Sequence, residues 1–428
     1  MSSICELSDD LLVKILSLVK TKDAVATSLL SKRWLSLWKL VPRLDYVTTP
    51  WHSSDPSSDF INNFLLLSEA PVLETMHLRL GYFCKREEHE RWVEIAVARH
   101  VRVLELIHST YPSTPMPCPS SLFTCRGLVV LSLQEVMIWE IPSTIFLQSL
   151  KTLSLLCVRF CSRRDDELVH TLLSACPVLE TLVVRRWLED CVTTFNIAVP
   201  SLQSLYIMHR PGGHVQTDDR ECVINAPSLK ALKVSDELSW FRLLVEMPKL
   251  VKAEIKIRQD DSKKLLRCLA SAKHLSLCVT SAKQLLTEKS VENLCQLEYL
   301  ELCTICSSDW LCLLLKHSPK LRVLRLNNQT SQRNCCGSSR KIRVKWEEPC
   351  CVPECLVTSL ETVEWIGYEG TETEKEVAIY ILEKANHLKK MTISRHITNL
   401  REKYRTLIDL VSRLSCCASK CRLEFVRL

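Results

Sequence analysis

The stretch "LVHTLLSACPVLETL" (Leu168–Leu182) changes its hydrophobic period at Pro177. Apolar residues before the proline recur at helical spacing, whereas those after it begin the pattern L-x-x-L-x-L, whose last positions alternate as in a strand. The same order returns in "LCLLLKHSPKLRVLRL" (Leu311–Leu326). A helix, a turn at proline and a strand therefore form one unit, and its reappearance indicates a repeat architecture.

The strand half of this unit recurs along most of the chain, with conservative replacements of the leucines. We find units that begin at residues 73, 101, 128, 150, 179, 202, 229, 250, 272, 297, 321, 360 and 388. The twelve intervals cover 315 residues, so the mean period is about 26, within the range typical of leucine-rich repeats.

A repeat of this kind predicts an α/β solenoid. Unit positions 1, 4 and 6 should point into a shared core, and positions 3, 5 and 7 should face outward along one parallel sheet. An ordinary α/β domain is the alternative, but regular spacing over this length argues against it. Asparagine after the third leucine is largely absent, so we expect an irregular horseshoe, with a surface loop at Gln329–Lys341.

The N-terminal residues predict three short helices. Ser8 can cap the first, Asp9 and Asp10 suit its first turn, and Leu7 can pack on Leu12. Two further helical stretches run to Pro42. Three short helices in about forty residues bury too little apolar surface to be stable alone. They are either the cap of the solenoid or a module that binds a partner.

The segment "ICELSDDLLVKILSLVKTKDAVATSLLSKRWLSLWKLVPRLDYV" (Ile4–Val47) resembles the F-box of plant F-box/FBD/leucine-rich-repeat proteins. The resemblance implies docking on a Skp-type adaptor and, through it, on a cullin. The residues it assigns to the small core and the adaptor interface are Leu7, Leu11, Leu12, Ile15, Leu16, Val25, Leu29, Leu30, Trp34 and Trp38. The chain departs from the family at Ser8 and Lys20, where the family usually has proline.

The segment Trp346–Ile393 resembles the FBD domain found after such repeats. The matching residues are Trp346, Pro349, Pro353, Cys355, Leu360, Trp365, Tyr368, Gly370, Tyr380, Ala385, Leu388 and Met391. We expect a turn at Gly367–Gly370, a helix from about Thr373, and closing units that shield the last leucines from water. The tail should add a helix at Leu400–Leu414 and a strand "CRLEFVRL".

These patterns give five regions. They are an F-box (1–47), a linker with a first helical segment (48–72), leucine-rich repeats (73–345), an FBD region (346–395) and a C-terminal closing segment (396–428). We place the first boundary at Thr48–Asp59, which is rich in Ser, Thr, Pro and Asp.

Composition excludes several classes of chemistry. The chain has 428 residues but 7 glycines, and it contains no G-x-G-x-x-G or G-x-x-x-x-G-K-[ST] loop for phosphates. It has neither a G-x-S-x-G elbow nor an H-E-x-x-H helix. The stretch "REEHERW" (Arg86–Trp92) reads as a solvated charged segment before a helix. We therefore expect a non-catalytic protein without a cofactor.

The 23 cysteines predict reduced thiols that act as small apolar fillers, since no secretory signal precedes them. Cys303 and Cys306 form C-x-x-C but lack a second pair at zinc-finger spacing, so we expect no metal site. The longest apolar runs are too short to span a membrane. We expect a cytoplasmic or nuclear protein, with no membrane partner.

Target binding is expected at outward strand positions. These positions carry seven cations and four glutamates. The excess of cations suits an acidic or phosphorylated target segment. A solvated strand face with mixed charges is the alternative interpretation, and it is the one we favour. The candidate residues are Arg79, Arg185, Tyr206, Lys233, Lys252, Lys256, Tyr299 and Arg325.

The sequence therefore predicts a substrate-recognition subunit of a Skp-cullin-F-box type ubiquitin ligase. One alternative is a non-ligase interaction scaffold with a degenerate F-box. Another is a nucleic-acid binder, but a net charge of +7 without concentrated Lys/Arg runs argues against nucleic acid as a partner. The sequence names neither the target nor a modification that triggers its recognition.

Overall fold

The computed structural model describes residues 4–48, 57–81, 84–109, 115–161, 165–186, 192–209, 221–236, 241–243, 246–258, 262–280, 294–304, 310–328, 346, 348–395 and 421–427. The chain divides into two compact units. The N-terminal unit comprises residues 1–202 with 212–222, and the C-terminal unit comprises residues 203–211 with 223–428.

The N-terminal unit begins with short helices and continues with alternating strands and helices. Its elements up to the first sheet strands are η1 (Ile4–Glu6), α1 (Asp9–Leu16), α2 (Thr21–Ala26), η2 (Thr27–Leu29), α3 (Trp34–Leu37), η3 (Trp38–Leu40), β1 (Arg43–Val47), α4 (Ser57–Leu67), β2 (Thr75–Leu80), α5 (Arg86–Ala98) and β3 (Val103–His108). The rest are β4 (Met116–Pro117), η4 (Ser120–Thr124), β5 (Val130–Gln134), β6 (Val136–Ile138), β7 (Thr152–Leu156), β8 (Arg159–Phe160), α6 (Asp165–Ser174), β9 (Thr181–Arg186) and β10 (Thr194–Ala198).

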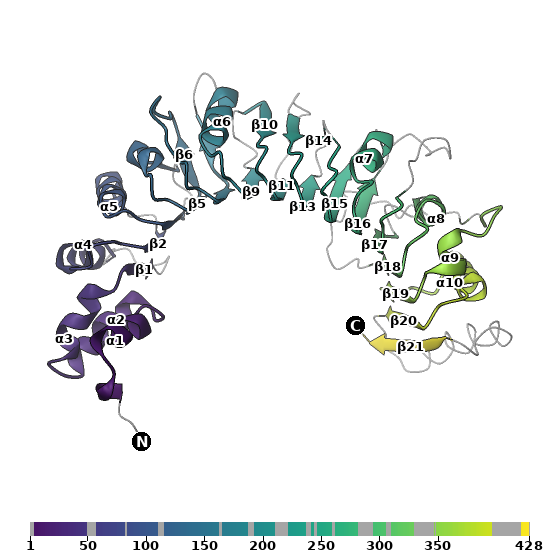
Figure 1. Cartoon of the computed structure of the whole chain (residues 1–428), viewed down its shortest axis with the longest axis horizontal. Helices are drawn as coiled ribbons and strands as arrows, with labels where there is room; N and C mark the ends of the chain where they lie inside the picture. The colour runs from purple at the N-terminus through teal and green to yellow at the C-terminus, as the bar shows by residue number, and fades with distance from the viewer. Residues whose placement is uncertain are drawn as a thin grey trace. The chain divides into compact units, whose positions relative to one another are not determined.

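The main sheet of this unit is parallel throughout, in the order β1-β2-β3-β5-β7-β9. A smaller parallel sheet, β4-β6-β8, lies beside it. Helices α4 and α5 lie on one face of the main sheet (Figure 1).

The C-terminal unit continues the same alternation. Its elements are β11 (Ser204–His209), β12 (Glu221–Asn225, whose first two residues group with the other unit), β13 (Ala231–Asp236), β14 (Phe241–Leu243), β15 (Lys252–Arg258), α7 (Ser262–Cys268), β16 (His274–Thr280), β17 (Tyr299–Cys303), α8 (Leu311–Lys316), β18 (Val323–Asn327), α9 (Glu354–Thr358), β19 (Thr362–Ile366), α10 (Glu372–Lys384), β20 (Lys390–Arg395) and β21 (Arg422–Arg427).

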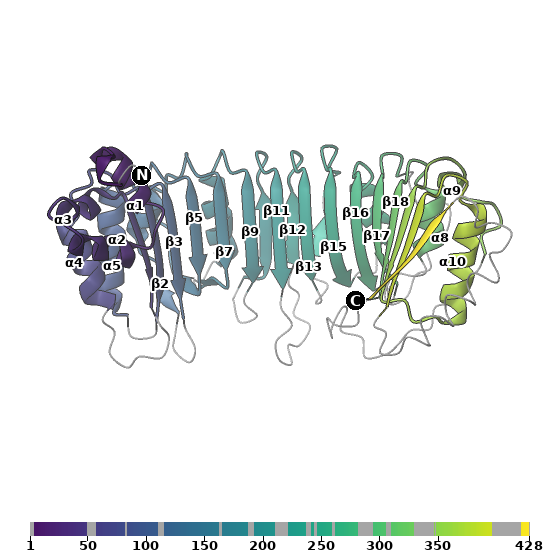
Figure 2. The same cartoon turned by 90° about the horizontal axis from the view of Figure 1, so that it is seen from below.

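Its sheet runs in the order β11-β13-β15-β16-β17-β18-β19-β20-β21, and all eight neighbouring pairs of strands are parallel. Figure 2 shows these strands side by side and pointing the same way. Helices α7 to α10 lie on one face of the sheet (Figure 1).

Each of the thirteen repeat units predicted from the sequence contains a strand of one of these sheets, so the repeat prediction is confirmed. The unit that begins at 73 buries Leu73, Met76 and Leu78, each at most 1% exposed. The intervening side chains of β2 are partly or largely exposed. Leucines at positions 1, 4 and 6 therefore build the core, as expected for stacked units that cannot bury their apolar faces alone.

The sheet begins earlier than the sequence indicated. Arg43–Val47, which we assigned wholly to the F-box, forms β1 and pairs with β2 in register from Arg43↔Thr75 to Val47↔Arg79. Leu44 and Tyr46 alternate inward, 0% and 3% exposed. The N-terminal helices are thus joined directly to the first strand of the solenoid.

The expectation for "REEHERW" was wrong. These residues form the first turns of α5, and the helix buries His89, Trp92, Val93 and Ala96. The spacing of these four residues is that of one helix face, hidden in the sequence by the charged residues between them. Trp92 donates from Nε1 to Asn62 Oδ1 of α4 at 2.8 Å.

The FBD region closes the C-terminal unit. Gly367 and Gly370 both adopt positive φ (73° and 81°) in the turn after β19. Thr371 then caps α10 in a capping box with Glu374, so the helix begins at Glu372, one residue before the predicted start. Strand β21 confirms the predicted final strand. The loop expected at 329–341 and the helix expected at 400–414 lie outside the described residues.

Candidate functional site

The first helix has two apolar sides. Leu12 and Leu16 point inward, 0% and 3% exposed, and join a core with Ala24, Trp34 and Leu37. Residues four apart lie on the same face of a helix, so this pair forms one stripe toward the core. A second stripe of apolar side chains on the same helix points away from it.

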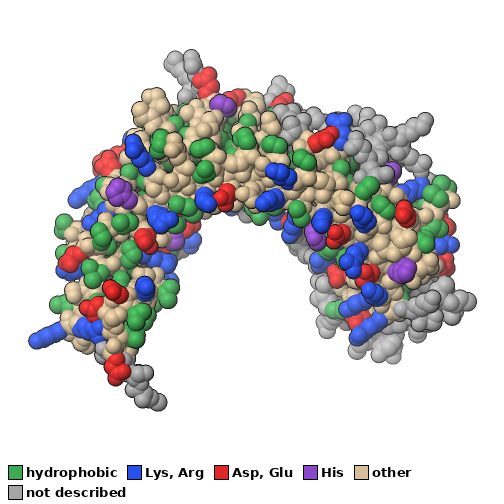
Figure 3. All heavy atoms as spheres, viewed as in Figure 1, with side chains coloured by type: hydrophobic (Ala, Val, Ile, Leu, Met, Phe, Trp, Pro, Cys, Tyr) green, Lys and Arg blue, Asp and Glu red, His purple; other side chains and the backbone are tan. Residues whose placement is uncertain are grey.

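The outward stripe leaves large aliphatic side chains in water. Leu11 and Ile15 of α1 are 46% and 38% exposed, and Leu18 in the following turn is 82% exposed. Leu29 and Leu30 at the end of η2 reach 88% and 69%. We call the exposed leucines and isoleucine between residues 11 and 35 the leucine surface; its members are Leu11, Ile15, Leu18, Leu29, Leu30 and Leu35. In Figure 3, hydrophobic side chains lie at the surface of this end of the N-terminal unit.

A different side of the N-terminal helices is fixed to the solenoid. Trp38 packs on Phe64 of α4, with ring centroids 5.8 Å apart. The backbone N–H of Asp45 in β1 donates to Thr21 Oγ1 at 2.7 Å. The ammonium group of Lys22 lies 4.5 Å from the ring centroid of Tyr46. These contacts set the orientation of the helices and do not use the leucine surface.

Arg33 joins the first and third helices. Its Nε donates to Asp9 Oδ1 at 2.9 Å, and Nη2 donates to the carbonyl oxygen of Leu7. Asp9 is the first residue of α1, so the pair holds the helix start against the segment before α3. Because Asp9 is 61% exposed, the ion pair itself contributes little, of the order of 0–1 kcal/mol.

Ser8 and Lys20, where the family usually has proline, keep a backbone compatible with it. Both are N-cap residues, and their φ angles are −65° and −63°, close to the value that proline fixes. The Ser8 side chain makes no capping hydrogen bond, contrary to our expectation. Both helices therefore begin at a residue whose φ angle proline could also adopt.

The structure separates the ten predicted F-box residues into three groups. Leu11, Ile15, Leu29 and Leu30 are exposed, whereas Leu7 and Val25 are half-buried. The remaining four, Leu12, Leu16, Trp34 and Trp38, are at most 8% exposed. Those four are packed against the chain's own core and offer almost no surface for contact with another protein.

The outward strand positions of the C-terminal unit carry charges that pair with one another. Lys233 lies 2.7 Å from Glu254 on the next strand, and Arg325 lies 3.6 Å from Glu364. Burial raises the pKa of Tyr299, whose hydroxyl lies between Glu301 and Arg325. The predicted basic bias is thus largely neutralised within the sheet. Tyr206 (37% exposed) and the exposed Lys252 are the more accessible candidates, and Lys256 is half-buried.

The N-terminal unit holds the other two predicted target-binding residues. Arg79 is exposed at the end of β2. Arg185 is half-buried in β9 and donates from Nε to Cys157 Sγ at 3.2 Å. The structure does not bring these two arginines together, because β3, β5 and β7 lie between their strands.

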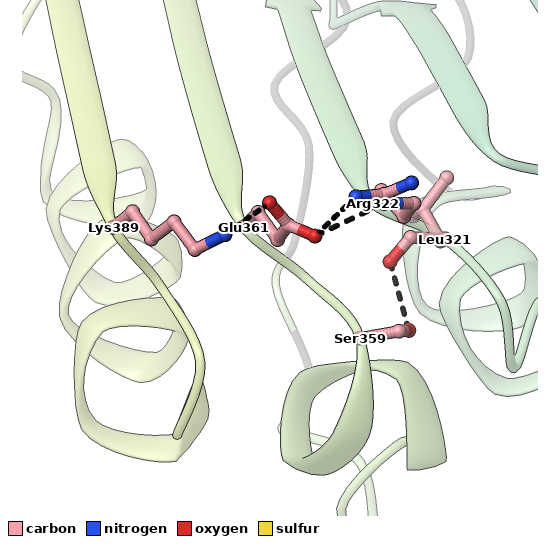
Figure 4. Close-up of polar contacts among 5 residues, drawn as sticks. All are labelled: Leu321, Arg322, Ser359, Glu361 and Lys389. Carbon is pink, nitrogen blue, oxygen red and sulfur yellow. Dashed lines mark hydrogen bonds and ion pairs between the residues drawn. The ribbon is translucent and has the colours of Figure 1, made fainter.

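Sequence reasoning missed a row of charges at unit position 2, where each strand begins. Lys151 pairs with Glu180 at 2.9 Å, Lys273 with Glu298 at 3.6 Å, and Arg322 with Glu361 at 2.7 Å. Figure 4 shows the last of these, where Glu361 also contacts Lys389. The signal was the alternation of charge sign at this position in consecutive units.

Burial governs the chemistry of several thiols. Cys176 and Cys355 are fully buried, and burial raises the pKa of each to about 12. These thiols pack as apolar groups.

Within the described residues, no cluster of three or more His, Cys, Asp or Glu side chains could hold a metal ion. Nor does the part of the chain that the structure describes contain a helix long and apolar enough to cross a membrane.

A leucine-rich solenoid that carries a small helical module with an exposed apolar face defines a class of protein built to bind other proteins. Comparison with known families matches three segments of the chain. The F-box domain family matches residues 4–46, the leucine-rich repeats of FBD-associated F-box proteins match residues 89–250, and the FBD family matches residues 347–393.

Relatives in Arabidopsis thaliana align over nearly the whole chain. An FBD-associated F-box protein (At5g56440) is 45% identical over 99% of this chain and 100% of its own length. An F-box/FBD/LRR-repeat protein (At4g26340) is 38% identical over 96% and 97%. The chain belongs to the family of FBD-associated F-box proteins with leucine-rich repeats. This family indicates a substrate-adaptor role in ubiquitin ligase complexes.

Proposed function

We propose that the protein is the substrate-recognition subunit of a Skp-cullin-F-box type ubiquitin ligase. The N-terminal helices bind a Skp-type adaptor, the adaptor connects them to a cullin, and the repeats hold a target protein. The chain itself performs no chemical step. It raises the rate of ubiquitin transfer by keeping the target close to enzymes carried by other subunits, in the cytoplasm or the nucleus.

The leucine surface carries this proposal. Scattered single apolar residues are normal on a protein surface, but six large aliphatic side chains, each at least 38% exposed, are costly to leave in water within one small helical module. The same module is anchored to β1 and α4 through other residues. The adaptor contacts are therefore Leu11, Ile15, Leu29 and Leu30, together with Leu18 and Leu35, which the sequence did not single out.

The buried residues among the ten predicted F-box residues support adaptor binding indirectly. Leu12, Leu16, Trp34 and Trp38 hold the helices that present the leucine surface. Leu7 and Val25 lie at the border between the core and this surface. Because Ser8 and Lys20 preserve the helix starts, they give no support to a degenerate F-box.

Co-purification with a Skp-type adaptor tests this function. The double substitution Leu29→Glu with Leu30→Glu places carboxylates on the leucine surface and leaves the core intact. We expect the dissociation constant to rise at least thirtyfold, because interface anchors contribute about 2 kcal/mol or more. The matched control is Trp139→Glu, since Trp139 is 53% exposed but lies outside the F-box. Equal adaptor binding by both variants would contradict the proposal.

A further inference from the structure

A cleft of about 540 Å³ opens in the C-terminal unit where strands β18, β19 and β20 begin. Its basic lining residues are Lys320, Arg322, His387 and Lys389, and its acidic lining residues are Glu298 and Glu361. The charged residues at unit position 2 immediately precede their strands, so the geometry of the sheet fixes their order along the edge. Figure 4 shows the centre of this cleft.

Both carboxylate oxygens of Glu361 accept hydrogen bonds from cationic side chains. Its Oε1 accepts from Nε and Nη2 of Arg322 at 3.0 and 2.7 Å, and its Oε2 accepts from Nζ of Lys389 at 2.6 Å. Hydrogen bonds from these two cations lower the pKa of Glu361. One carboxylate thus holds two cations in place, and the group keeps an excess positive charge. Arg322 is 59% exposed and Lys389 is 72% exposed, so both remain open to solvent.

A serine hydroxyl in the lining of the cleft joins two of its turns. Ser359 Oγ lies within hydrogen-bond distance of the carbonyl oxygens of Pro319 and Leu321, at 2.8 and 2.9 Å, which ties the turn before β19 to the turn before β18. Its hydroxyl proton is committed to these backbone acceptors. The groups that can donate to a ligand are therefore the basic side chains of the two flanking turns.

The spacing of the cations along this edge is regular. Lys273, Arg322 and Lys389 precede β16, β18 and β20, so consecutive cations are two strands apart. Strands lie about 4.8 Å apart, which gives about 10 Å between cations. A polyproline II segment rises about 3.1 Å per residue with three residues per turn, so every third side chain returns to the same face after about 9 Å. Glu298 and Glu361 lie between the cations and disfavour additional acidic residues there.

We propose that this edge binds an extended, polyproline II-type segment of a protein partner that carries an acidic group at every third residue. The acidic groups contact Lys273, Arg322 and Lys389, and the intervening residues pass over the two glutamates. Carboxylate side chains and phosphoserine both have the required charge. The proposal concerns the C-terminal unit alone, and its test does not require adaptor binding by the F-box.

Fluorescence anisotropy with labelled peptides tests this site on the full chain. The probe is (Glu-Pro-Pro)4, and two controls are (Gln-Pro-Pro)4 and a peptide of the same composition with its four glutamates adjacent. We expect binding of the spaced acidic peptide to be at least tenfold tighter than binding of either control. A (phosphoserine-Pro-Pro)4 arm identifies the source of the charge: tighter binding than the glutamate peptide assigns the site to phosphorylated partners, and equal or weaker binding assigns it to Asp/Glu segments.

Substitutions of the cations and of Glu361 should change the affinity for the acidic peptide in opposite directions. Lys389→Gln should weaken binding of (Glu-Pro-Pro)4 at least threefold, and Arg322→Gln with Lys389→Gln at least tenfold. Glu361→Gln should tighten binding, because it removes a negative charge from the cleft. Lys151→Gln is the matched control, since Lys151 forms the same type of pair with Glu180 in the N-terminal unit. Equal binding of the spaced and adjacent peptides, or weaker binding by Glu361→Gln with unchanged circular dichroism, would overturn the proposal.

Discussion

Two buried histidines predict that the N-terminal unit loses stability in mild acid. His89 of α5 and His108 at the end of β3 are 0% and 3% exposed, and their rings meet edge to face at 4.7 Å. Burial lowers the pKa of His89 to about 4. Burial, together with the neighbouring charge of His89, lowers the pKa of His108 to about 3, and Glu135 opposes this shift. We therefore expect both imidazoles to be neutral in the folded protein at neutral pH.

The unfolded chain binds protons at these residues first. Its histidines titrate near 6.5, above the folded values, so the stabilisation is complete above that pH and is lost as the pH falls toward about 4. Between pH 7.5 and pH 5, each histidine should lower the free energy of unfolding by about 2 kcal/mol, and the pair by about 4 kcal/mol. A loss of that size is a large part of the stability of an ordinary domain.

Urea denaturation followed by circular dichroism at pH 7.5 and pH 5 measures this loss. His89→Leu and His108→Leu should each reduce the difference between the two pH values by about 2 kcal/mol, whatever they do to the stability at pH 7.5. His170→Leu is the matched control, because His170 is exposed on α6 and its imidazole stays in water on folding. A double variant with the same pH dependence as the unsubstituted protein would refute this reasoning.

Three further changes test the local structure. Leu12→Ala should lower the free energy of unfolding of the N-terminal unit by about 2–5 kcal/mol, because it leaves a cavity in the F-box core; thermal unfolding with and without adaptor measures this. Lys20→Pro should preserve adaptor binding and raise thermal stability by about 0.4–1 kcal/mol, since φ is already −63°, and a lower melting temperature would contradict this. Gly367→Ala should cost about 1–3 kcal/mol in urea denaturation, since φ is +73° and an added Cβ would lie 2.5 Å from Asn328 O; a neutral effect would show that the turn relaxes.

The repeat units were predictable because their physical signal is local. Alternation within L-x-x-L-x-L depends only on neighbouring residues, and each unit carries its own strand and turn. Leu321, Leu324 and Leu326 illustrate this, since all three are fully buried as their positions in the unit predict. The FBD turn was predictable for a similar reason, because glycine is the residue that positive φ favours.

Other features depend on partners that are distant in the sequence. The sequence could not show which F-box leucines face inward, because Leu11 and Leu12 are adjacent and equally apolar. Leu12 faces inward because it packs with Ala24, Trp34 and Leu37, which lie twelve or more residues further along the chain. The pairing of Arg325 with Glu364 likewise crosses a long connection between β18 and β19, so a count of charges overstated how basic the strand face is.

The proposed function rests on one claim, that the leucine surface is covered by another polypeptide in the ligase complex. Hydrogen exchange of the full chain, with and without a Skp-type adaptor, measures this directly. We predict slower exchange of backbone amides in residues 9–37 on adaptor binding, and unchanged exchange in the strands of the C-terminal unit. A complex that forms without protecting residues 9–37, or that protects the strands instead, would contradict the claim.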